Sequence, residues 1–555
     1  MPWLASYPTG IPAEINIDAY SSLADVIEQS CQAFSNNVAY RSFGQTLTFA
    51  ELDQASQAFA NYLQTKCGVE KGDRVALMMP NLLQYPVALF GILRIGAVVV
   101  NVNPLYTPRE LHHQLDDSGA KVIIVLENFA HTVQQVLAEV PTSIVIVTRL
   151  GDMVGGLKGQ LINIVVKYLK RSVPRWSFER FDWFKNALRD GETFAAKPVK
   201  LNHDDLAFLQ YTGGTTGVAK GAMLSHGNMV ANLEQASAWL GTALTTGKEA
   251  VITALPLYHI FSLTANCLVF MKLGGENILI TNPRDLPAFI KTLKNTRFTA
   301  LTGVNTLFNA LLHTPGFADI NFSSLKLTLG GGMAVQRSVA HSWQQVTRSP
   351  LLEAYGLTET SPAVCINPLI DGEFNGSIGL PIPSTVVTVR GEHDDEQMPS
   401  GDIGELCVHG PQVMKGYWQR PEETIKVMTS DGALRTGDMG YIDAKGYVFL
   451  TDRKKDMILV SGFNVYPNEV EEVVVSHPDV IEAAAVGVPD AHSGEIVKVY
   501  VVRKNDLLTE QMLIDFCQKN MTRYKVPKQV EFRDHLPKTN VGKILRRALR
   551  SGEQT

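Results

Sequence analysis

The stretch Tyr211-Thr-Gly-Gly-Thr-Thr-Gly-Val-Ala-Lys-Gly221 carries the strongest signal in this chain. Its four glycines allow backbone conformations closed to residues with a Cβ atom, so successive N–H groups can point toward one anion. Hydroxyl groups and a lysine ammonium add further donors for phosphate oxygens. The stretch therefore predicts a polyphosphate-binding loop; the alternative is a flexible linker. The residues that we assign to nucleotide binding here are Tyr211, Thr212, Gly213, Gly214, Thr215, Thr216, Gly217 and Lys220.

This loop differs from a Walker A loop, in which the lysine is followed by serine or threonine. Lys220 instead follows Ala219 and precedes Gly221. Apolar sequence at Leu206 to Leu209 leads into the loop, and a helix-like run follows it. A strand, a glycine-rich turn and a helix in this order favour a phosphate site over a linker.

Size and composition exclude several classes of protein. At 555 residues the chain exceeds what one hydrophobic core usually supports, so two or more domains are expected. Hydrophobic residues make up 45% and charged residues 19%, which is typical of a soluble globular protein. A formal net charge of −5 argues against nucleic-acid binding, which needs a basic excess. Six cysteines without CxxC spacing favour reduced thiols over a disulfide or zinc framework.

The sequence also indicates a location. Met1 to Ser6 lacks the basic and apolar regions of a secretory signal, and no run of about 18 uncharged apolar residues occurs. We therefore expect a cytoplasmic protein. Residues 153–178 combine five basic residues with apolar side chains, Trp176 among them, and contain no acidic residue. Such a segment suits a helix on an anionic bilayer, at the inner face of the cell membrane. The alternative is an insertion that packs on its own domain.

Hydrophobic patterning predicts an α/β fold. Apolar runs such as Val75–Met78 and Val98–Val102 alternate with helix-like segments such as Phe49–Gln64, which indicates parallel sheets layered with helices. The same alternation resumes from Ala250 to Leu329. After Gly432 short strands and turns dominate. The last hundred or so residues predict a small α+β domain, with a helix at Pro467–Ser476 and strands at Ala483–Gly487 and Ile496–Arg503.

The loop at 211–221 resembles the signature of the adenylate-forming enzymes, which include acyl-CoA synthetases, luciferases and peptide-synthetase adenylation domains. Further motifs follow in the family's order over nearly the whole chain, which is most similar to bacterial long-chain fatty acid–CoA ligases. The resemblance implies an enzyme that uses ATP and Mg²⁺, joins a long-chain fatty acid to CoA as co-substrate, and passes through an acyl-adenylate. It also implies an N-terminal adenylation domain over 1–452 with a distorted barrel-like part, a hinge at 453–456 near Lys455, and a mobile C-terminal lid over 457–555.

The resemblance assigns roles to the hexapeptide Tyr355-Gly-Leu-Thr-Glu-Thr360. It places the Tyr355 ring against adenine and Thr358 at the α-phosphate, with Gly356 in the nucleotide site. It makes Glu359 a ligand of Mg²⁺, and hard oxygen ligands suit that ion. We assign Thr215 as a second metal ligand. Taken alone, the hexapeptide also fits the start of a helix.

Three further motifs complete the nucleotide site by resemblance. Gly330-Gly-Gly332, after the apolar run Leu325–Leu329, separates adenine from the acyl chain, with Gly331 and Gly332 in contact with nucleotide. Asp438, in Arg435-Thr-Gly-Asp438, holds the ribose hydroxyls, and Arg453 also reaches the ribose. By themselves, a glycine run is an ordinary strand-to-helix turn and Thr-Gly-Asp is a common turn.

The resemblance assigns the chemistry to His259 and Lys543. His259, in Leu255-Pro-Leu-Tyr-His259, lies at the carboxylate end of the acyl site, whereas a lone histidine in apolar sequence is usually a core residue. Lys543, in Pro537-Lys-Thr-Asn-Val-Gly-Lys543, bridges the substrate carboxylate and the α-phosphate, whereas a lysine in a basic tail is usually solvated. Rotation of the lid then presents Ser461 and Gly462 to the pantetheine arm of CoA.

Two other functions stay open from the sequence. An acyl-AMP ligase could load a carrier protein instead of CoA, and a non-catalytic protein could bind fatty acid at the membrane for uptake. The motif residues Lys220, Thr358, Glu359, Asp438, Arg453 and Lys543 favour the enzyme. The sequence reveals neither the preferred chain length nor the oligomeric state, and a homodimer is compatible with it.

Overall fold

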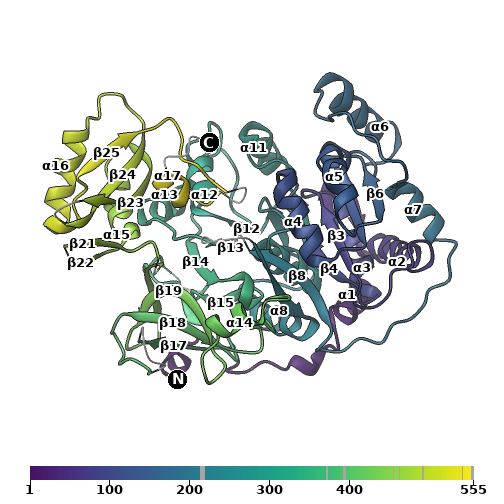
Figure 1. The fold of residues 1–555 in the computed structure, drawn as a ribbon, viewed down its shortest axis with the longest axis horizontal. Helices are drawn as coiled ribbons and strands as arrows, with labels where there is room; N and C mark the ends of the chain where they lie inside the picture. Colours follow the sequence, from purple (N-terminus) through teal and green to yellow (C-terminus); the bar gives the residue numbers. More distant parts are fainter. Residues whose placement is uncertain are drawn as a thin grey trace.

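The computed structural model describes residues 1–212, 219–369, 373–391, 396–453, 455–461, 463–490, 493–539 and 542–551. Within them lie four β-sheets (Figure 1). Two large, mostly parallel sheets occupy the N-terminal part, an antiparallel sheet follows, and a smaller sheet belongs to the C-terminal part. None of the helices in these ranges is both long and apolar enough to cross a membrane.

The first large sheet has seven strands in the order β7-β6-β5-β3-β4-β8-β9. Neighbouring strands are parallel except β9, which runs antiparallel to β8. Its central strands are buried on both faces, which explains their continuous valine, isoleucine and leucine sequence. The strands are β3 (Arg74–Met78), β4 (Val98–Asn101), β5 (Val122–Leu126), β6 (Ile144–Thr148), β7 (Asp182–Trp183), β8 (Leu206–Thr212) and β9 (Lys220–Ser225).

The second large sheet has nine strands in the order β16-β15-β14-β13-β12-β10-β11-β1-β2. The six strands from β14 to β1 are parallel, and antiparallel strands close both edges. The strands are β1 (Val38–Ser42), β2 (Gln45–Thr48), β10 (Ala250–Thr253), β11 (Glu276–Leu279), β12 (Ala300–Gly303), β13 (Leu327–Gly331), β14 (Leu351–Gly356), β15 (Ala363–Ile366) and β16 (Leu380–Pro381).

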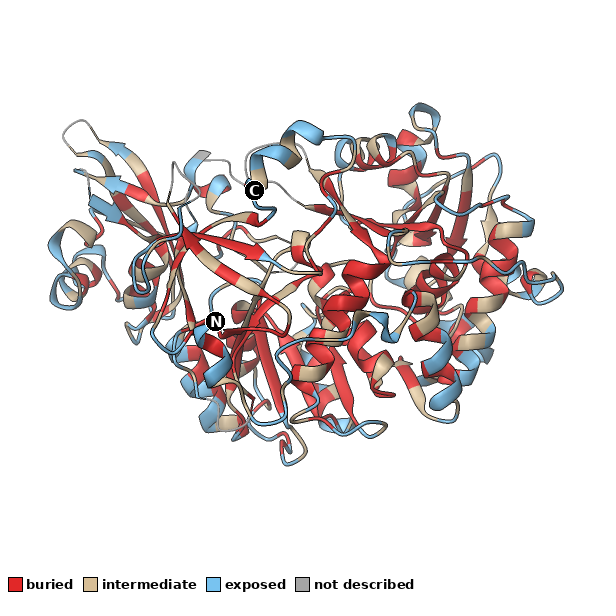
Figure 2. Ribbon diagram, turned by 90° about the horizontal axis from the view of Figure 1, so that it is seen from below, coloured by how far each residue is buried: buried red, intermediate tan, exposed pale blue. Residues whose placement is uncertain are grey.

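Helices α1 (Leu23–Ala33), α2 (Phe49–Thr65), α3 (Gln84–Arg94) and α8 (His226–Leu240) contribute to one hydrophobic core together with strands of both large sheets. Helix α8 is almost entirely buried, and its polar side chains Asn228, Asn232 and Gln235 donate there to backbone carbonyl groups. Helix α2 begins with a capping box, in which the Thr48 side chain accepts from the Glu51 N–H group and Glu51 accepts from Thr48. Figure 2 shows the buried residues concentrated in the strands and in the helices between them.

The remaining helices of the N-terminal part include a segment that projects from the body of the molecule (Figure 1). That segment is α6 (Gly156–Ile164), continued by a π-helical turn over Val165–Leu169. The others are α4 (Pro108–Ser118), α5 (Ala130–Val136), α7 (Phe184–Gly191), α9 (Ile260–Ser262), a π-helical turn (Leu263–Leu268), α10 (Val269–Lys272), α11 (Leu286–Asn295), α12 (Asn305–Leu312), α13 (Arg337–Thr347) and α14 (Pro421–Val427).

The third sheet is antiparallel, in the order β17 (Val386–Arg390), β18 (Gly404–His409), β19 (Leu434–Ile442) and β20 (Val448–Arg453). The resemblance implied a distorted barrel-like part of the N-terminal domain without assigning it residues. The core of the third sheet is shared with β15 of the nine-stranded sheet. This contact brings the third sheet against the edge of the second.

The C-terminal sheet has its own core. Its strands are β21 (Ile458–Val460), β22 (Phe463–Val465), β23 (Val480–Asp490), β24 (Gly494–Arg503) and β25 (Gln529–Phe532), with helices α15 (Pro467–Val475), α16 (Glu510–Asn520) and α17 (Arg546–Ser551). A separate core built from strands and helices is the α+β character that the sequence predicted. The hinge at 453–456 stays a prediction.

The strands and helices predicted by periodicity form where expected, with ends shifted by a few residues. One expectation is wrong in detail. Gly330-Gly-Gly332 was expected to follow a strand that ends at Leu329, but β13 continues through Gly331 and only Gly332 turns away. The two glycines stay in the strand because they pair in register with Gly303 of β12 and with Glu353 and Ala354 of β14.

Candidate active site

The candidate site lies at the carboxyl ends of strands from several sheets. In open α/β sheets this edge is where ligands bind, because the loops that leave the strands meet there. Strand β8 ends at Thr212, β13 at Gly331 and β14 at Gly356, and each end carries residues that the sequence assigned to the nucleotide. Residues 213–218 lie outside the described part of the structure, so the assignments of Gly213, Gly214, Thr215, Thr216 and Gly217 stay predictions.

A hydrogen-bonded cluster joins three predicted nucleotide residues. The Tyr355 hydroxyl donates to Asp438 Oδ2 at 2.6 Å, and Arg453 Nε lies 3.0 Å from Asp438 Oδ1. Asp438 on β19 and Arg453 on β20 are partners in the antiparallel register, which places their side chains together. The Asp438 carboxylate raises the pKa of Arg453, so this guanidinium stays charged. A ring, a carboxylate and a cation thus meet at one point.

The lysine of the C-terminal motif reaches this cluster from the C-terminal part of the chain. Gly332 adopts φ +77°, and a Cβ atom there would lie 3.2 Å from Lys543 Cε, so the lysine side chain packs directly on this turn. Burial and the nearby Arg453 together lower the pKa of Lys543 to about 8, although Asp438 and Glu359 act in the opposite sense. Lys543 is therefore close to four predicted site residues, namely Gly332, Glu359, Asp438 and Arg453.

Contacts from α12 hold the C-terminal part in this position. The Thr306 hydroxyl donates to the Gly542 carbonyl at 3.0 Å, and the Asn309 amide donates to the Ile481 carbonyl at 3.2 Å. Thr539 fixes the turn itself, because its hydroxyl accepts from the Lys543 N–H group at 3.0 Å. Thr306 and Asn309 were not identified from the sequence, since no motif marks them.

His259 lies just before α9, with its Nδ1 accepting from the Phe261 N–H group at 3.3 Å. Burial, together with the charge of Lys543, lowers the pKa of His259 to about 3. The ring is therefore neutral near pH 7. Phe261 lies against β13, because a Cβ atom on Gly331 would be 3.0 Å from its ring. The predicted acyl-site histidine is thus a neighbour of both Lys543 and the glycine strand.

The hexapeptide Tyr355–Thr360 begins at the end of β14 and turns sharply after Gly356. Gly356 has no room for a Cβ atom, which would lie 1.9 Å from the Pro362 carbonyl oxygen. Thr358 begins a single 3₁₀ turn, and Glu359 is the second residue of that turn. Glu359 Oε1 accepts from the Tyr417 hydroxyl at 2.7 Å. The turn directs Glu359 toward Lys543 and Arg453, whose pKa values it raises.

Lys220 and Tyr211, which flank the predicted phosphate loop, both have partners within the protein, and their assignment to the nucleotide stays a prediction. Lys220 Nζ lies 2.6 Å from Glu423 Oε2 and above the Tyr417 ring. The Tyr211 hydroxyl donates to Asp117 Oδ2 at 2.6 Å, and its ring packs on Gly221. Tyr211 is therefore a buried support of the strand, with its hydroxyl engaged elsewhere. Thr212 pairs with Lys220 across β8 and β9.

Ser461 lies apart from this cluster. Its N–H group donates to the Ser493 carbonyl at 2.7 Å, within the C-terminal part. Gly462 lies outside the described residues. The structure therefore brings together His259, Gly331, Gly332, Tyr355, Thr358, Glu359, Asp438, Arg453 and Lys543, with Lys220 beside Tyr417, and leaves Ser461 outside.

The residues around Glu359 fit a magnesium ion that shares its ligands with a nucleotide. No group of three or more His, Cys, Asp or Glu side chains that could hold a metal occurs in the described ranges. Mg²⁺ does not need such a group, since it typically binds one or two carboxylates together with phosphate oxygens and waters. One oxygen of Glu359 is held by Tyr417, which leaves the other for a metal. The contribution of Thr215 stays a prediction.

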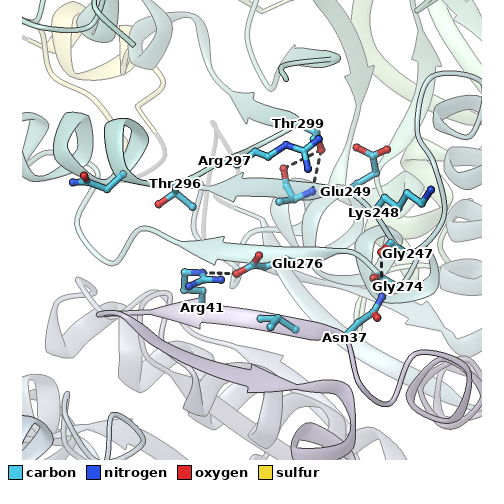
Figure 3. Close-up of a pocket in the computed structure, with 13 residues that line it drawn as sticks. Asn37, Arg41, Gly247, Lys248, Glu249, Gly274, Glu276, Thr296, Arg297 and Thr299 are labelled. Carbon is cyan, nitrogen blue, oxygen red and sulfur yellow. Dashed lines mark hydrogen bonds and ion pairs between the residues drawn. The ribbon is translucent and has the colours of Figure 1, made fainter. Parts of the chain in front are cut away.

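A separate pocket of about 440 Å³ lies at the amino-terminal ends of β1, β10 and β11 in the nine-stranded sheet (Figure 3). Glu249 immediately precedes β10 and Glu276 begins β11, so this pocket faces away from the carboxyl ends. Its two acidic residues are paired within the protein: Glu276 with Arg41 at 2.5 Å, and Glu249 with Lys326 at 2.6 Å. The pocket is not part of the candidate site.

Comparison with known proteins agrees with this geometry. The AMP-binding enzyme family matches residues 27–418, and the C-terminal domain of AMP-binding enzymes matches residues 469–543. The chain belongs to the AMP-binding enzyme family. A long-chain-fatty-acid–CoA ligase of Escherichia coli O6:H1 is 58% identical to this AMP-binding enzyme over 548 residues, covering 99% of this chain and 97% of the relative.

Two further proteins are similar to this chain over nearly its whole length. A long-chain-fatty-acid–CoA ligase of Haemophilus influenzae is 50% identical over 554 residues, with 99% and 98% coverage of the two chains. The crystal structure of ATP-bound MatB from Rhodopseudomonas palustris superposes with a TM-score of 0.82 at 29% identity, covering 95% of this AMP-binding enzyme and 98% of MatB. The similarity extends through both the N-terminal and the C-terminal part.

Proposed function

We propose that this protein is an ATP-dependent long-chain fatty acid–CoA ligase that proceeds through an acyl-adenylate. The observation that carries the proposal is the position of Lys543, which extends from the C-terminal part onto the Gly332 turn beside Asp438 and Arg453. A cation delivered to this point meets the requirement of joining two anions, a carboxylate and a triphosphate. The relatives in Escherichia coli and Haemophilus influenzae carry the name of this activity.

In the first half-reaction, a carboxylate oxygen of the fatty acid bonds to the α-phosphorus of ATP and the bond to pyrophosphate breaks. Lys543 would screen the repulsion between the two anions, and the neutral His259 could hydrogen-bond the carboxylate without adding a second cation. Tyr355 would contact adenine and Asp438 the ribose hydroxyls. A bound magnesium ion would supply further charge neutralisation at the phosphates, and Glu359 would be its ligand.

In the second half-reaction, the thiol sulfur of CoA bonds to the acyl carbon and AMP leaves. Ser461 lies outside the site while Lys543 lies inside it. Both cannot serve one active site in a single arrangement, which supports a rotation of residues 457–555 about the predicted hinge at 453–456. The rotation would withdraw Lys543 and bring the loop of Ser461 and Gly462 to the pantetheine arm.

The test of this function separates it from its two alternatives. We expect oleate-dependent exchange of labelled pyrophosphate into ATP, and then oleoyl-CoA when CoA is added. Each buried methylene contributes about 0.8 kcal/mol, so KM should fall from acetate through octanoate to oleate. Absence of exchange would indicate a non-catalytic fatty-acid-binding protein, and exchange with transfer only to a carrier protein would indicate an acyl-AMP ligase. Acetate as the best substrate would contradict the long-chain assignment.

We further propose that the enzyme docks on the inner face of the cell membrane through a surface on α6 and the turn after it. This docking surface consists of five apolar side chains whose exposed fractions are 84%, 60%, 51%, 69% and 79%, namely Leu157, Leu161, Ile164, Tyr168 and Leu169. The first four follow helical spacing and so lie on one face. Contiguous exposed apolar residues of this kind are typical of a membrane or protein contact.

The charges around the docking surface favour an anionic bilayer. Lys167 pairs with Glu127 at 2.7 Å, and Lys158 donates to the Phe43 carbonyl. Lys170, Arg171 and Arg175 have no acidic partner among the described residues. One sequence expectation is wrong: Trp176 does not join the exposed face but packs against Phe178, Phe181 and Trp183. Basic side chains near an anionic surface contribute about 1 kcal/mol each, so the free ones matter most.

A further inference from the structure

Tyr417 is a buried aromatic residue that no motif of the sequence singled out. It lies between β18 and α14, and 7% of its surface is exposed. Its backbone pairs with Ala222 of β9, and its N–H group donates to the Thr424 hydroxyl of α14 at 2.9 Å. The adjacent Trp418 N–H group donates to the Gly221 carbonyl at 2.8 Å. Tyr417 is therefore anchored on both sides, beside the end of the phosphate loop.

The side chain of Tyr417 contacts two residues that the site needs in fixed places. Its hydroxyl donates to Glu359 Oε1 at 2.7 Å, which holds one carboxylate oxygen and leaves the other oxygen free for a metal. Its ring lies under Lys220, with Nζ 4.9 Å from the ring centroid. A cation above an aromatic face is attracted by the ring quadrupole. One residue thus touches the predicted metal carboxylate and the predicted phosphate lysine, which are far apart in the sequence.

Lys220 has a second neighbour, Glu423, whose Oε2 lies 2.6 Å from its ammonium. Arriving phosphates must replace this carboxylate as the partner of Lys220, whereas the ring contact needs no such exchange because it involves no anion. Tyr417 can therefore keep Lys220 near the phosphate loop while Glu423 is released. The hydroxyl contacts Glu359 and the ring contacts Lys220, so the two contributions can be separated by mutation.

We infer that Tyr417 is a positioning residue that orients Glu359 toward the metal and holds Lys220 toward the phosphates. The inference depends on the proposed function, because it requires that the site bind ATP with Mg²⁺. It assigns the metal-dependent part of ATP binding to the Tyr417 hydroxyl. It assigns the metal-independent part to the ring, through Lys220.

The test compares Tyr417→Phe with Tyr417→Leu by isothermal titration calorimetry, without fatty acid so that no reaction occurs. In Tyr417→Phe we expect ATP with Mg²⁺ to bind about tenfold more weakly, because a hydrogen bond to a charged group is lost. Affinity for ATP in EDTA should stay within about twofold, because the ring remains. In Tyr417→Leu both affinities should fall. Equal metal dependence in Tyr417→Phe and wild type would overturn the inference.

A double-mutant cycle with Glu359 guards against a general effect on folding. In a Glu359→Gln background, Tyr417→Phe should weaken binding of ATP with Mg²⁺ by less than about twofold, since the two residues act through one contact. Additive losses would show that Tyr417 does not act through Glu359. Wild-type protein that binds no ATP would refute the proposed function itself, whereas normal wild-type binding with an unaffected Tyr417→Phe refutes only the role of Tyr417.

Discussion

At the scale of single residues, burial sets the charge of the two groups nearest to the predicted reaction. Lys543 and His259 both lie in a site that disfavours cations, yet with different outcomes near pH 7. His259 is neutral because its pKa falls to about 3, whereas Lys543 keeps most of its charge with a pKa of about 8. One strong cation beside a neutral imidazole suits the binding of two anions without excess positive charge in the empty site.

The lowered pKa of Lys543 predicts a pH dependence. Below about pH 8 the free enzyme carries the ammonium, and as the pH rises through 8 the group becomes neutral. We therefore expect kcat/KM for ATP in acyl-AMP formation to fall above about pH 8, because kcat/KM reports groups of the free enzyme. Lys543→Arg, if it retains activity, should keep its rate to higher pH, since arginine stays protonated. The same decline in both enzymes would assign it to another group.

At the scale of elements, α6 and the turn after it form the docking surface, and the prediction concerns binding to vesicles. Lys170→Gln, Arg171→Gln and Arg175→Gln together should weaken binding to phosphatidylglycerol-containing vesicles about a hundredfold, from about 1 kcal/mol for each charge. Leu157→Ser with Leu161→Ser should weaken it as well, whereas Leu507→Ser should not, although Leu507 is 76% exposed. Co-sedimentation with the vesicles measures the binding of all three variants. If the first two variants sediment with vesicles as wild type does, membrane docking through this surface is refuted.

Elements were predictable from the sequence to the extent that their signals are local. The strands β3 and β5 are continuous apolar runs, and the capping box of α2 begins it at Phe49. The orientation of Trp176 was not predictable, because its partners Phe178, Phe181 and Trp183 form a cluster that depends on tertiary packing. Apolar composition indicates a contact surface, but packing decides which side chains remain exposed.

At the scale of the whole molecule, the site is assembled from segments that are distant in the sequence. Motifs identified Lys220, Glu359 and Lys543, since each lies in a recognisable local pattern. The residues that hold them, Tyr417, Glu423 and Thr306, carry no such pattern, and Tyr417 meets Glu359 across a separation of 58 residues. Tyr417 and Glu423 lie between β18 and β19, and Thr306 lies on α12, so only the tertiary packing of these segments brings them to the site. The sequence therefore indicates the candidate reacting groups but not the residues that contact and support them.

The position of the C-terminal part is the central claim at this scale, and it is tested by measuring the two half-reactions separately. The variants are Lys543→Ala and, as a matched control from the same motif, Lys538→Ala. The ammonium of Lys538 lies 2.6 Å from Glu482, with which it forms an ion pair. Pyrophosphate release from ATP and oleate without CoA reports adenylation. Conversion of supplied oleoyl-AMP and CoA to oleoyl-CoA reports thioester formation.

We predict that Lys543→Ala slows adenylation by about a hundredfold or more, as expected for the loss of one group that stabilises the transition state. Thioester formation should stay within about twofold of wild type, because the rotated lid no longer places Lys543 in the site. Lys538→Ala should leave both rates near wild type. Equal losses in the two half-reactions of Lys543→Ala would contradict a lid that delivers this lysine for adenylation and then withdraws it.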